Sequence, residues 1–222
     1  LKEDGSMFLV IGDSYDERGS LRQVPHRLSL AMSDDGWILR NTLVWHKLNA
    51  KPENGKIKRW GTSYEFIFFF TLSTNYYFNM DKVRVPYLTG FSRGAPRHHR
   101  TDEKMNMKQQ TNLHHPLGRV PRDFIDDDVV QTMIINQSEK FVPDKNLEHS
   151  ATFSEKLIKP FILGTSTEGD TILDPFLGSG TTAKVSLDNG RKCIGYEIST
   201  VFVDTSYQRC GEGLNQKNVK VM

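Results

Sequence analysis

The sequence predicts an α/β fold built around a parallel β-sheet, and three observations support this class. The C-terminal third alternates strand, glycine-rich loop, helix and strand, at residues 171–173, 174–180, 181–189 and 191–196, which is the pattern of a parallel βαβ unit. Residues 6–11 form a continuous apolar run of strand length, as in strands that are covered on both faces. A chain of 222 residues is also long enough to bury a full α/β core.

The N-terminal part of the chain alternates strands and a helix in the same way. Gly12 ends the apolar strand, and helical spacing of apolar residues follows Pro25, a residue suited to the first turn of a helix. Gly36 is expected to end that helix, because glycine readily adopts the backbone conformation that follows a last helical turn. The elements expected here are a helix at residues 25–32, strands at 37–45 and 64–72, and a short hairpin-like return at 76–78.

Residues 86–148 lack regular periodicity. They are polar and rich in His, Arg, Gln and Asn, with one apolar cluster at residues 129–135. We interpret the segment as an inserted, partly irregular subdomain; disorder of part of it is the alternative, and the order of residues 90–117 stays open. Regular structure resumes after Ser154, a typical N-cap residue. Two further helices are expected at residues 154–163 and 201–210.

Lys and Arg are concentrated in two central segments, although the net charge is only +2. Residues 47–60 contain five Lys or Arg and one Glu, and residues 91–122 contain seven Lys or Arg, four His and two acidic residues. Such clustering suits a polyanionic partner, whereas two solvated loops are the alternative interpretation.

Other features of the composition exclude several classes of protein. The apolar share of 37% is typical of a globular chain, and no apolar run is long enough for a membrane helix. Two cysteines are too few for a disulfide scaffold or a structural zinc site, and they fit a reducing, cytosolic setting. We expect no metal site, because the adjacent histidines at 98–99 and 114–115 would point in opposite directions on extended backbone. The acidic run at 126–128 is expected to be a solvated helix start.

The most specific pattern is the nine-residue loop Asp-Pro-Phe-Leu-Gly-Ser-Gly-Thr-Thr at residues 174–182, between a strand and a helix. Gly178 and Gly180 would let the backbone approach a bound molecule, and the helix N-terminus offers free amide groups. Glu197, 17 residues beyond Gly180, could accept hydrogen bonds from both hydroxyls of a ribose. The loop is neither a dinucleotide fingerprint, since Ala183 replaces the third glycine, nor a P-loop. It therefore predicts a nucleoside-bearing cofactor, with a ligand-free tight turn as the alternative.

This loop is similar to the S-adenosylmethionine motif of the beta-class amino-methyltransferases of DNA. Residues 149–157 resemble the family segment that precedes this motif and also contacts the cofactor, with Ser150 and Ser154 at its usual proline positions. The resemblance extends over nearly the whole chain except residues 86–117. It implies a Rossmann-like methyltransferase sheet and S-adenosylmethionine as cofactor. The cofactor-binding residues that it implies are His149, Thr152, Phe153, Asp174, Phe176, Gly178, Ser179, Gly180, Thr181 and Glu197.

The resemblance also implies three regions and a reaction. Residues 1–85 would form the target-base half of the core, residues 86–148 a target-recognition insertion, and residues 149–222 the cofactor-binding half. The family transfers a methyl group to the exocyclic amine of a flipped base, either adenine N6, which we slightly favour, or cytosine N4. Direct transfer needs no covalent intermediate, so neither cysteine is expected to act as a nucleophile.

The family's catalytic motif, a polar residue followed by Pro-Pro and an aromatic residue, does not occur in these residues. In the family order it would precede Leu1, so we expect it upstream and expect the 222 residues alone to be inactive. Two alternatives stay open: a catalytically incomplete DNA-binding remnant, and a Rossmann-like methyltransferase acting on RNA, protein or a small molecule.

Double-stranded DNA is the expected partner, in a prokaryotic or phage cytoplasm and with a companion restriction endonuclease. The residues expected near the target base are Asp13, Tyr15, Trp45, His46 and Tyr64, although core packing, or helix capping for Asp13, is the competing interpretation. The residues expected to contact DNA are Lys56, Lys58, Arg59, Arg93, Arg97 and Arg100.

Overall fold

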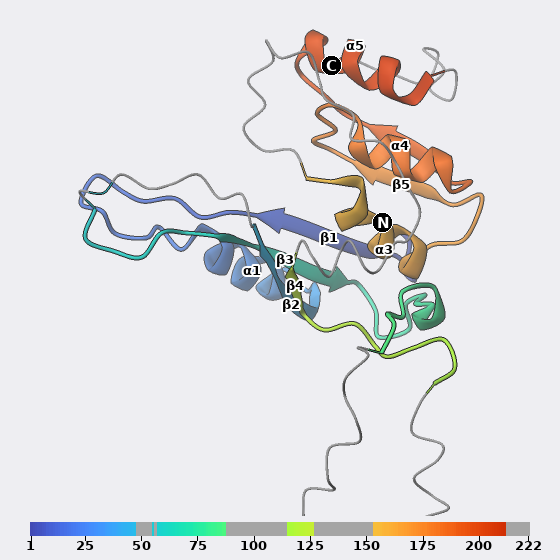
Figure 1. The fold of residues 1–222 in the computed structure, drawn as a ribbon, viewed down its shortest axis with the longest axis horizontal. Helices are drawn as coiled ribbons and strands as arrows, with labels where there is room; N and C mark the ends of the chain where they lie inside the picture. The colour runs from blue at the N-terminus through green and yellow to red at the C-terminus, as the bar shows by residue number, and fades with distance from the viewer. Residues whose placement is uncertain (48–54, 56, 88–114, 127–152, 212–222) are drawn as a thin grey trace, which may run out of the picture.

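The computed structural model describes residues 1–47, 55, 57–87, 115–126 and 153–211 (Figure 1). Its described strands form two separate sheets, and helices pack against both of them. The predicted α/β class is confirmed. No helix in these ranges is long and apolar enough to cross a membrane.

The larger sheet has four strands in the order β1-β3-β2-β4. Its strands are β1 (Ser6–Ile11), β2 (Ile38–His46), β3 (Tyr64–Thr71) and β4 (Phe124–Asp126). Both β1 and β2 pair antiparallel with β3, and β4 pairs parallel with β2. The three strands expected in the N-terminal part are confirmed to within one residue at each end. They pair antiparallel with one another, so the larger sheet is mixed and not the parallel sheet expected from the sequence.

The C-terminal unit is the predicted βαβ motif. Strands β5 (Thr171–Asp174) and β6 (Lys192–Gly195) pair in parallel, and α4 (Thr181–Asp188) connects them. Ile172 packs toward α4, whereas its neighbour Leu173 is exposed on the opposite face of this sheet. Coverage of both faces, as expected for parallel strands, is therefore not seen here among the described residues.

The predicted helices are confirmed at their expected places. Helix α1 (Val24–Asp34) has proline in its first turn, and Gly36 follows it with a left-handed φ of 96°. Helix α3 (Glu155–Thr165) is capped by Ser154, whose side chain accepts a hydrogen bond from the Leu157 amide. The last described helix is α5 (Thr200–Cys210).

The expected strand at residues 76–78 is wrong. These residues are irregular and lead into the short 3-10 helix η1 (Met80–Lys82). The aromatic side chains that prompted the expectation instead pack on Phe69 of β3, at ring distances of 5.5 Å for Tyr76 and 6.1 Å for Phe78. The rings of Tyr76 and Phe78 thus pack against the sheet although their own residues form no strand.

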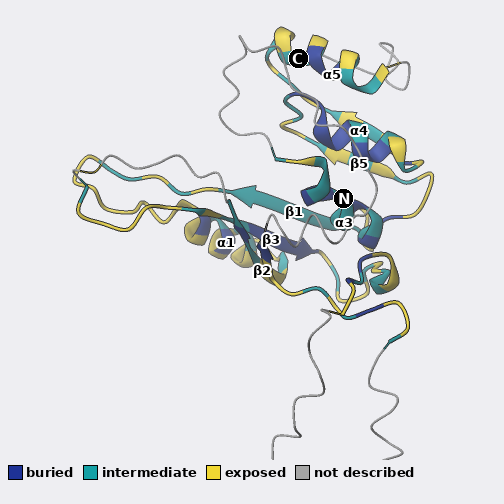
Figure 2. Cartoon of the chain, in the orientation of Figure 1, coloured by how far each residue is buried: buried dark blue, intermediate teal, exposed yellow. Residues whose placement is uncertain are grey.

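Helix α3 holds the two sheets together. Leu157 packs with Trp45, Ile67 and Ile125 of the four-stranded sheet. On another side of the same helix, Ile158 and Ile162 pack with Val185 of α4. Figure 2 shows the buried residues along β3 and α4, on either side of this helix. The C-terminal unit is therefore positioned on the N-terminal sheet through α3.

Part of the segment interpreted as irregular joins the sheet. Residues 115–126 approach the core through a bridge between Val85 and Arg119, and their last three residues form β4. Asp126 lies in this strand, whereas residues 127 and 128 of the acidic run expected to start a helix lie outside the described residues. The apolar cluster at 129–135 and residues 90–114 lie outside the described residues.

Candidate cofactor site and nucleic-acid interface

The loop at residues 174–180 leaves β5 and turns sharply into α4. The Asp174 carboxylate accepts a hydrogen bond from the Phe176 amide at 2.9 Å, which closes the first turn. Gly178 and Gly180 have φ values of 56° and 83°, and this left-handed conformation strongly favours glycine. The amide of Leu177 donates to the Tyr196 carbonyl at 2.9 Å, which keeps the loop beside the end of β6.

Glu197 stands at the end of β6, as expected, and binds the loop directly. One carboxylate oxygen accepts from the Gly178 amide at 2.8 Å, and the other accepts from the Ser199 amide at 2.8 Å. A carboxylate has about four lone-pair positions, so each oxygen can accept a further hydrogen bond. Glu197 therefore fixes the loop while retaining acceptors for the hydroxyl groups of a ligand.

The structure corrects the reason why Gly180 is required. A Cβ atom at this position would lie 2.8 Å from Cβ and 3.0 Å from Cα of Ser206, on helix α5. The space beside Gly180 is thus occupied by α5 and not left for a ligand. The close approach of α5, together with the positive φ, accounts for the glycine.

Two large apolar side chains are exposed beside the loop. Phe176 is 85% exposed, although its backbone amide is hydrogen-bonded to Asp174. Ile198 is 90% exposed and follows Glu197, which accepts a hydrogen bond from the loop. A contiguous exposed apolar patch can mark a ligand-binding surface, whereas single exposed apolar side chains are common.

The side-chain oxygens of Ser179 and Thr181 are buried and face Arg209. Its guanidinium lies 2.9 Å from the Thr181 hydroxyl and 3.4 Å from that of Ser179, and it also donates to Glu155 at 2.7 Å. Sequence reasoning missed Arg209 and Glu155, because they lie 54 residues apart on different helices and no spacing rule connects them.

Neither cysteine has the properties of a nucleophile. Burial raises the pKa of Cys193 to about 12, and the nearby Asp174 carboxylate adds to this shift. Burial also raises the pKa of Cys210 to about 11. Because the thiolate is the reactive form, both side chains are held as inert thiols.

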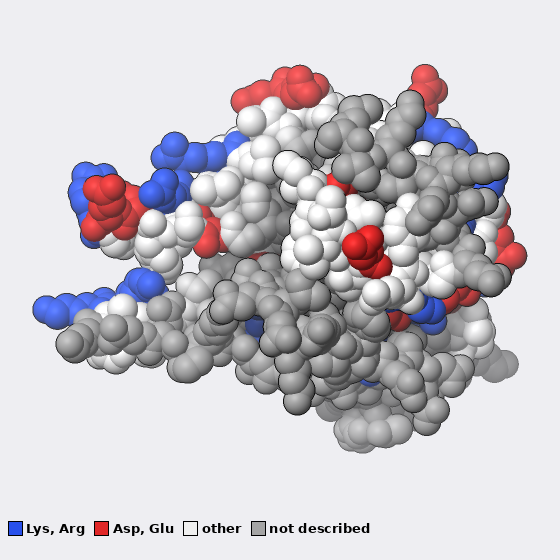
Figure 3. Space-filling view, turned by 90° about the horizontal axis from the view of Figure 1, so that it is seen from above, with Lys and Arg blue, Asp and Glu red and all other residues white. Residues whose placement is uncertain are grey.

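One end of the molecule carries a group of basic and aromatic side chains. The connection that follows β1 and the described residues that lead into β3 extend to this end, and Lys and Arg side chains gather there, with a few acidic ones (Figures 1 and 3). The Arg59 guanidinium lies 3.8 Å from the centre of the Tyr15 ring, and the Tyr15 hydroxyl is 3.3 Å from that of Thr62. Lys58 is exposed, and Trp60 is 95% exposed. Sequence reasoning did not single out Trp60.

The residues expected around the target base are divided between two faces of the sheet. Trp45 is 8% exposed and belongs to the core beneath α3. His46 and Tyr64 are paired across β2 and β3, and strand alternation puts them on the opposite face. Asp13 accepts from the Val24 amide at 3.1 Å, which favours its interpretation as a cap of α1. Tyr15 lies with Arg59, away from the core.

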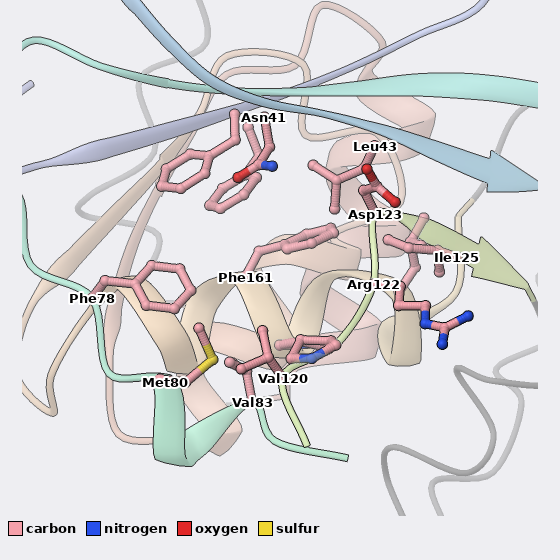
Figure 4. Close-up of a pocket in the computed structure, with 15 residues that line it drawn as sticks. Asn41, Leu43, Phe78, Met80, Val83, Val120, Arg122, Asp123, Ile125 and Phe161 are labelled. Atoms are coloured by element: carbon pink, nitrogen blue, oxygen red, sulfur yellow. The ribbon is translucent and has the colours of Figure 1, made fainter. Parts of the chain in front are cut away.

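A cavity of about 210 Å³ lies between the four-stranded sheet and α3. Figure 4 shows Asn41 and Leu43 of β2 on one side of it and Met80 and Val83 on the other. Its lining is mainly aromatic and aliphatic, and it includes none of the residues predicted for cofactor or base.

Several predicted site residues lie outside the described residues: His149, Thr152, Lys56, Arg93, Arg97 and Arg100. Phe153 is described, and it packs against both hydrophobic clusters of α3. Within the described ranges, no group of three or more His, Cys, Asp or Glu residues could hold a metal ion.

Known proteins match this chain over nearly its whole length. A family profile described as DNA methylase, for the N6 and N4 methyltransferases, matches residues 1–208. The type II methyltransferase M.Cfr9I of Citrobacter freundii is 30% identical, over 97% of this chain and 68% of that protein. The DNA adenine methyltransferase YhdJ of Escherichia coli K12 is 33% identical, over 78% of this chain and 52% of that protein.

Solved structures share the fold of this chain. The cytosine-N4-specific PvuII DNA methyltransferase matches 99% of this chain and 67% of its own, with a TM-score of 0.67 and 19% identity. Further matching structures include complexes with S-adenosylmethionine. The chain therefore belongs to the DNA methylase family of S-adenosylmethionine-dependent enzymes that methylate the exocyclic amino groups of DNA bases.

Proposed function

We propose that this chain binds S-adenosylmethionine at the loop of residues 174–181 and Glu197, and that it serves site-specific methylation of a flipped base in double-stranded DNA. The observation that carries the proposal is the bond from the Gly178 amide to Glu197, which joins a left-handed glycine loop to an acidic residue at the end of the adjacent parallel strand. Nucleoside ligands bind at this edge of parallel sheets.

Each part of the site suits one part of the cofactor. The free acceptor positions of Glu197 suit the two ribose hydroxyls, and the exposed Phe176 ring suits a stacked adenine. The N-terminus of α4 suits the carboxylate of the methionine moiety, because its amide groups carry partial positive charge. His149, Thr152 and Phe153 would complete the site. When bound, the cofactor supplies an electrophilic methyl group for direct transfer to an amine.

The basic end of the molecule is the proposed DNA-contacting surface. Lys58 and Arg59 are exposed there, and the stacking of Arg59 on Tyr15 orders one of these cations. Lys56, Arg93, Arg97 and Arg100 are proposed to contribute further contacts, and residues 86–148 to form the target-recognition region between the halves at 1–85 and 149–222. His46 and Tyr64 are candidates for the target-base side of the site, whereas Trp45 would support it from the core.

Adenine N6 is our first candidate for the methylated position, because YhdJ, an adenine methyltransferase, is 33% identical to this chain. Cytosine N4 is the second, since the PvuII enzyme carries that specificity and shares the fold. Expressing the protein in a methylation-deficient host and measuring N6-methyladenine and N4-methylcytosine by nucleoside mass spectrometry separates the two. Absence of both products would favour the DNA-binding remnant.

The biological setting proposed is a bacterial or phage cytoplasm with a companion restriction endonuclease. The support is that M.Cfr9I is a type II methyltransferase from a bacterium. Methylated DNA should then resist the endonuclease that recognises the same sequence. If the DNA of an expressing host stays fully sensitive to cleavage by restriction endonucleases, the proposed companion endonuclease is contradicted.

The cofactor site is tested by calorimetric titration with S-adenosylmethionine. Gly178→Asp should abolish binding, because it adds a side chain and a second carboxylate beside Glu197. Gly169→Asp is the matched control: Gly169 also has a positive φ, of 86°, but it lies in an open turn with no atom within 4 Å of an added Cβ. Equal cofactor affinity for both variants would refute the assignment.

A further inference from the structure

The end of helix α5 reaches the cofactor loop through one side chain. The Arg209 side chain is 9% exposed, and its two terminal nitrogens form hydrogen bonds with different partners. One donates to the Thr181 hydroxyl at 2.9 Å and lies 3.4 Å from that of Ser179; the other donates to the Glu155 carboxylate at 2.7 Å. The guanidinium thus joins the loop to the first turn of α3.

We propose that Arg209, held in place by Glu155, is a positioning residue that fixes the cofactor loop in its binding conformation. The inference rests on the proposed cofactor site. The loop contains two left-handed glycines, and glycine is the residue with the largest number of alternative backbone conformations. Bonds from a buried, rigid group to residues 179 and 181 bracket Gly180 and restrict those alternatives. A loop ordered in advance binds more tightly, because less entropy is lost on binding.

The pairing with Glu155 explains why an arginine can serve in this position. A buried guanidinium without a counter-charge would be strongly unfavourable, and the Glu155 carboxylate, 16% exposed, supplies that charge. The planar fork of arginine can bond both partners at once, whereas a lysine offers a single point charge. The pair also couples two segments that were predicted separately to hold the cofactor, the loop at 174–182 and the residues that lead into α3.

The chain offers a second arginine as a control for purely structural effects. Arg191 is also buried, and it donates to the side chain and the carbonyl of Ser166 at 3.1 and 2.8 Å. It lies just beyond the C-terminal end of α4, at the opposite end from the cofactor loop. Removing either guanidinium breaks a buried polar network of similar size, but only Arg209 bonds the loop.

The test compares Arg209→Met, Arg209→Lys and Arg191→Met by calorimetric titration with S-adenosylmethionine, together with thermal unfolding. Both methionine variants should lower Tm. Arg209→Met should also weaken cofactor binding about tenfold, because the loop would then have to be ordered when the cofactor binds. Arg209→Lys should restore part of the affinity, and Arg191→Met should bind within about twofold of the wild type, as expected for a site distant from the ligand.

Glu155→Gln keeps the shape of the side chain that pairs with Arg209 but removes its charge. This variant tests the same role if Arg209→Met fails to fold. It should weaken cofactor binding in the same direction, by a smaller factor. If folded Arg209→Met and Glu155→Gln both bind S-adenosylmethionine as tightly as the wild type, the positioning role of Arg209 is overturned. Gly178→Asp distinguishes this result from failure of the site itself: a loss of binding there with unchanged affinity in Arg209→Met refutes only the role of Arg209.

Discussion

Replacing Gly180 by alanine should destabilise the protein through two separate effects. The left-handed backbone, with φ of 83°, costs an alanine roughly 1–2 kcal/mol. The new methyl group would also lie 2.8 Å from Cβ of Ser206, and overpacking of this kind costs about 1–3 kcal/mol. The combined loss of roughly 2–5 kcal/mol is a large share of the stability of an ordinary domain.

Urea unfolding of two glycine variants separates these effects. Gly169 has a similar φ of 86°, but nothing lies within 4 Å of an added Cβ, so Gly169→Ala should show the backbone cost alone. The difference between the two variants measures the contact with α5. The double variant Gly180→Ala, Ser206→Gly lacks the Ser206 Cβ that the new methyl group would meet. It should therefore regain part of the lost free energy of unfolding, which appears as a favourable coupling energy between the two substitutions.

Equal losses of unfolding free energy in Gly180→Ala and Gly169→Ala would refute the packing argument. The glycine would then be required only by its backbone conformation or by the ligand. Unchanged stability together with lost cofactor binding would restore the interpretation drawn from the sequence, in which the space beside Gly180 belongs to the ligand.

Three further perturbations test other parts of the structure. In urea titrations, Leu157→Ala should lower the free energy of unfolding by about 2–5 kcal/mol, because this fully buried residue joins α3 to the sheet. Leu30→Ala, on the exposed side of α1, is the control and should change the free energy of unfolding by less than about 0.5 kcal/mol. The free energy of unfolding should also fall as the pH rises above 9.0, the ordinary pKa of a thiol in the unfolded chain. In the folded protein the pKa is about 12 for Cys193 and about 11 for Cys210, so above pH 9.0 only the unfolded state loses these protons. Replacing Cys193 by alanine should flatten this fall, and an unchanged pH profile would contradict the burial argument. Arg59→Ala should weaken DNA binding and reduce the salt dependence of log affinity by about one unit in fluorescence anisotropy, and an unaltered slope would exclude a phosphate contact.

Local patterns in the sequence predicted the regular elements well. Apolar runs located β1, β2 and β3, and the proline and glycine signals located both ends of α1. The same rules misassigned residues 76–78, because an aromatic-rich segment satisfies a strand pattern equally well when it packs as irregular chain on a neighbouring sheet. The mixed order of the larger sheet also has no local signal, since pairing is decided by contacts between distant residues.

The sequence by itself determined the cofactor loop, because the chemistry of a strand, a glycine turn and a helix start is encoded in nine consecutive residues followed by Glu197. Only the tertiary structure decided why that loop has its shape. Gly180 is required by the approach of Ser206, and Ser179 and Thr181 face Arg209, which is paired with Glu155 on a third helix. These partners are brought together by packing of α3, α4 and α5, and such packing depends on the whole chain and not on any local spacing.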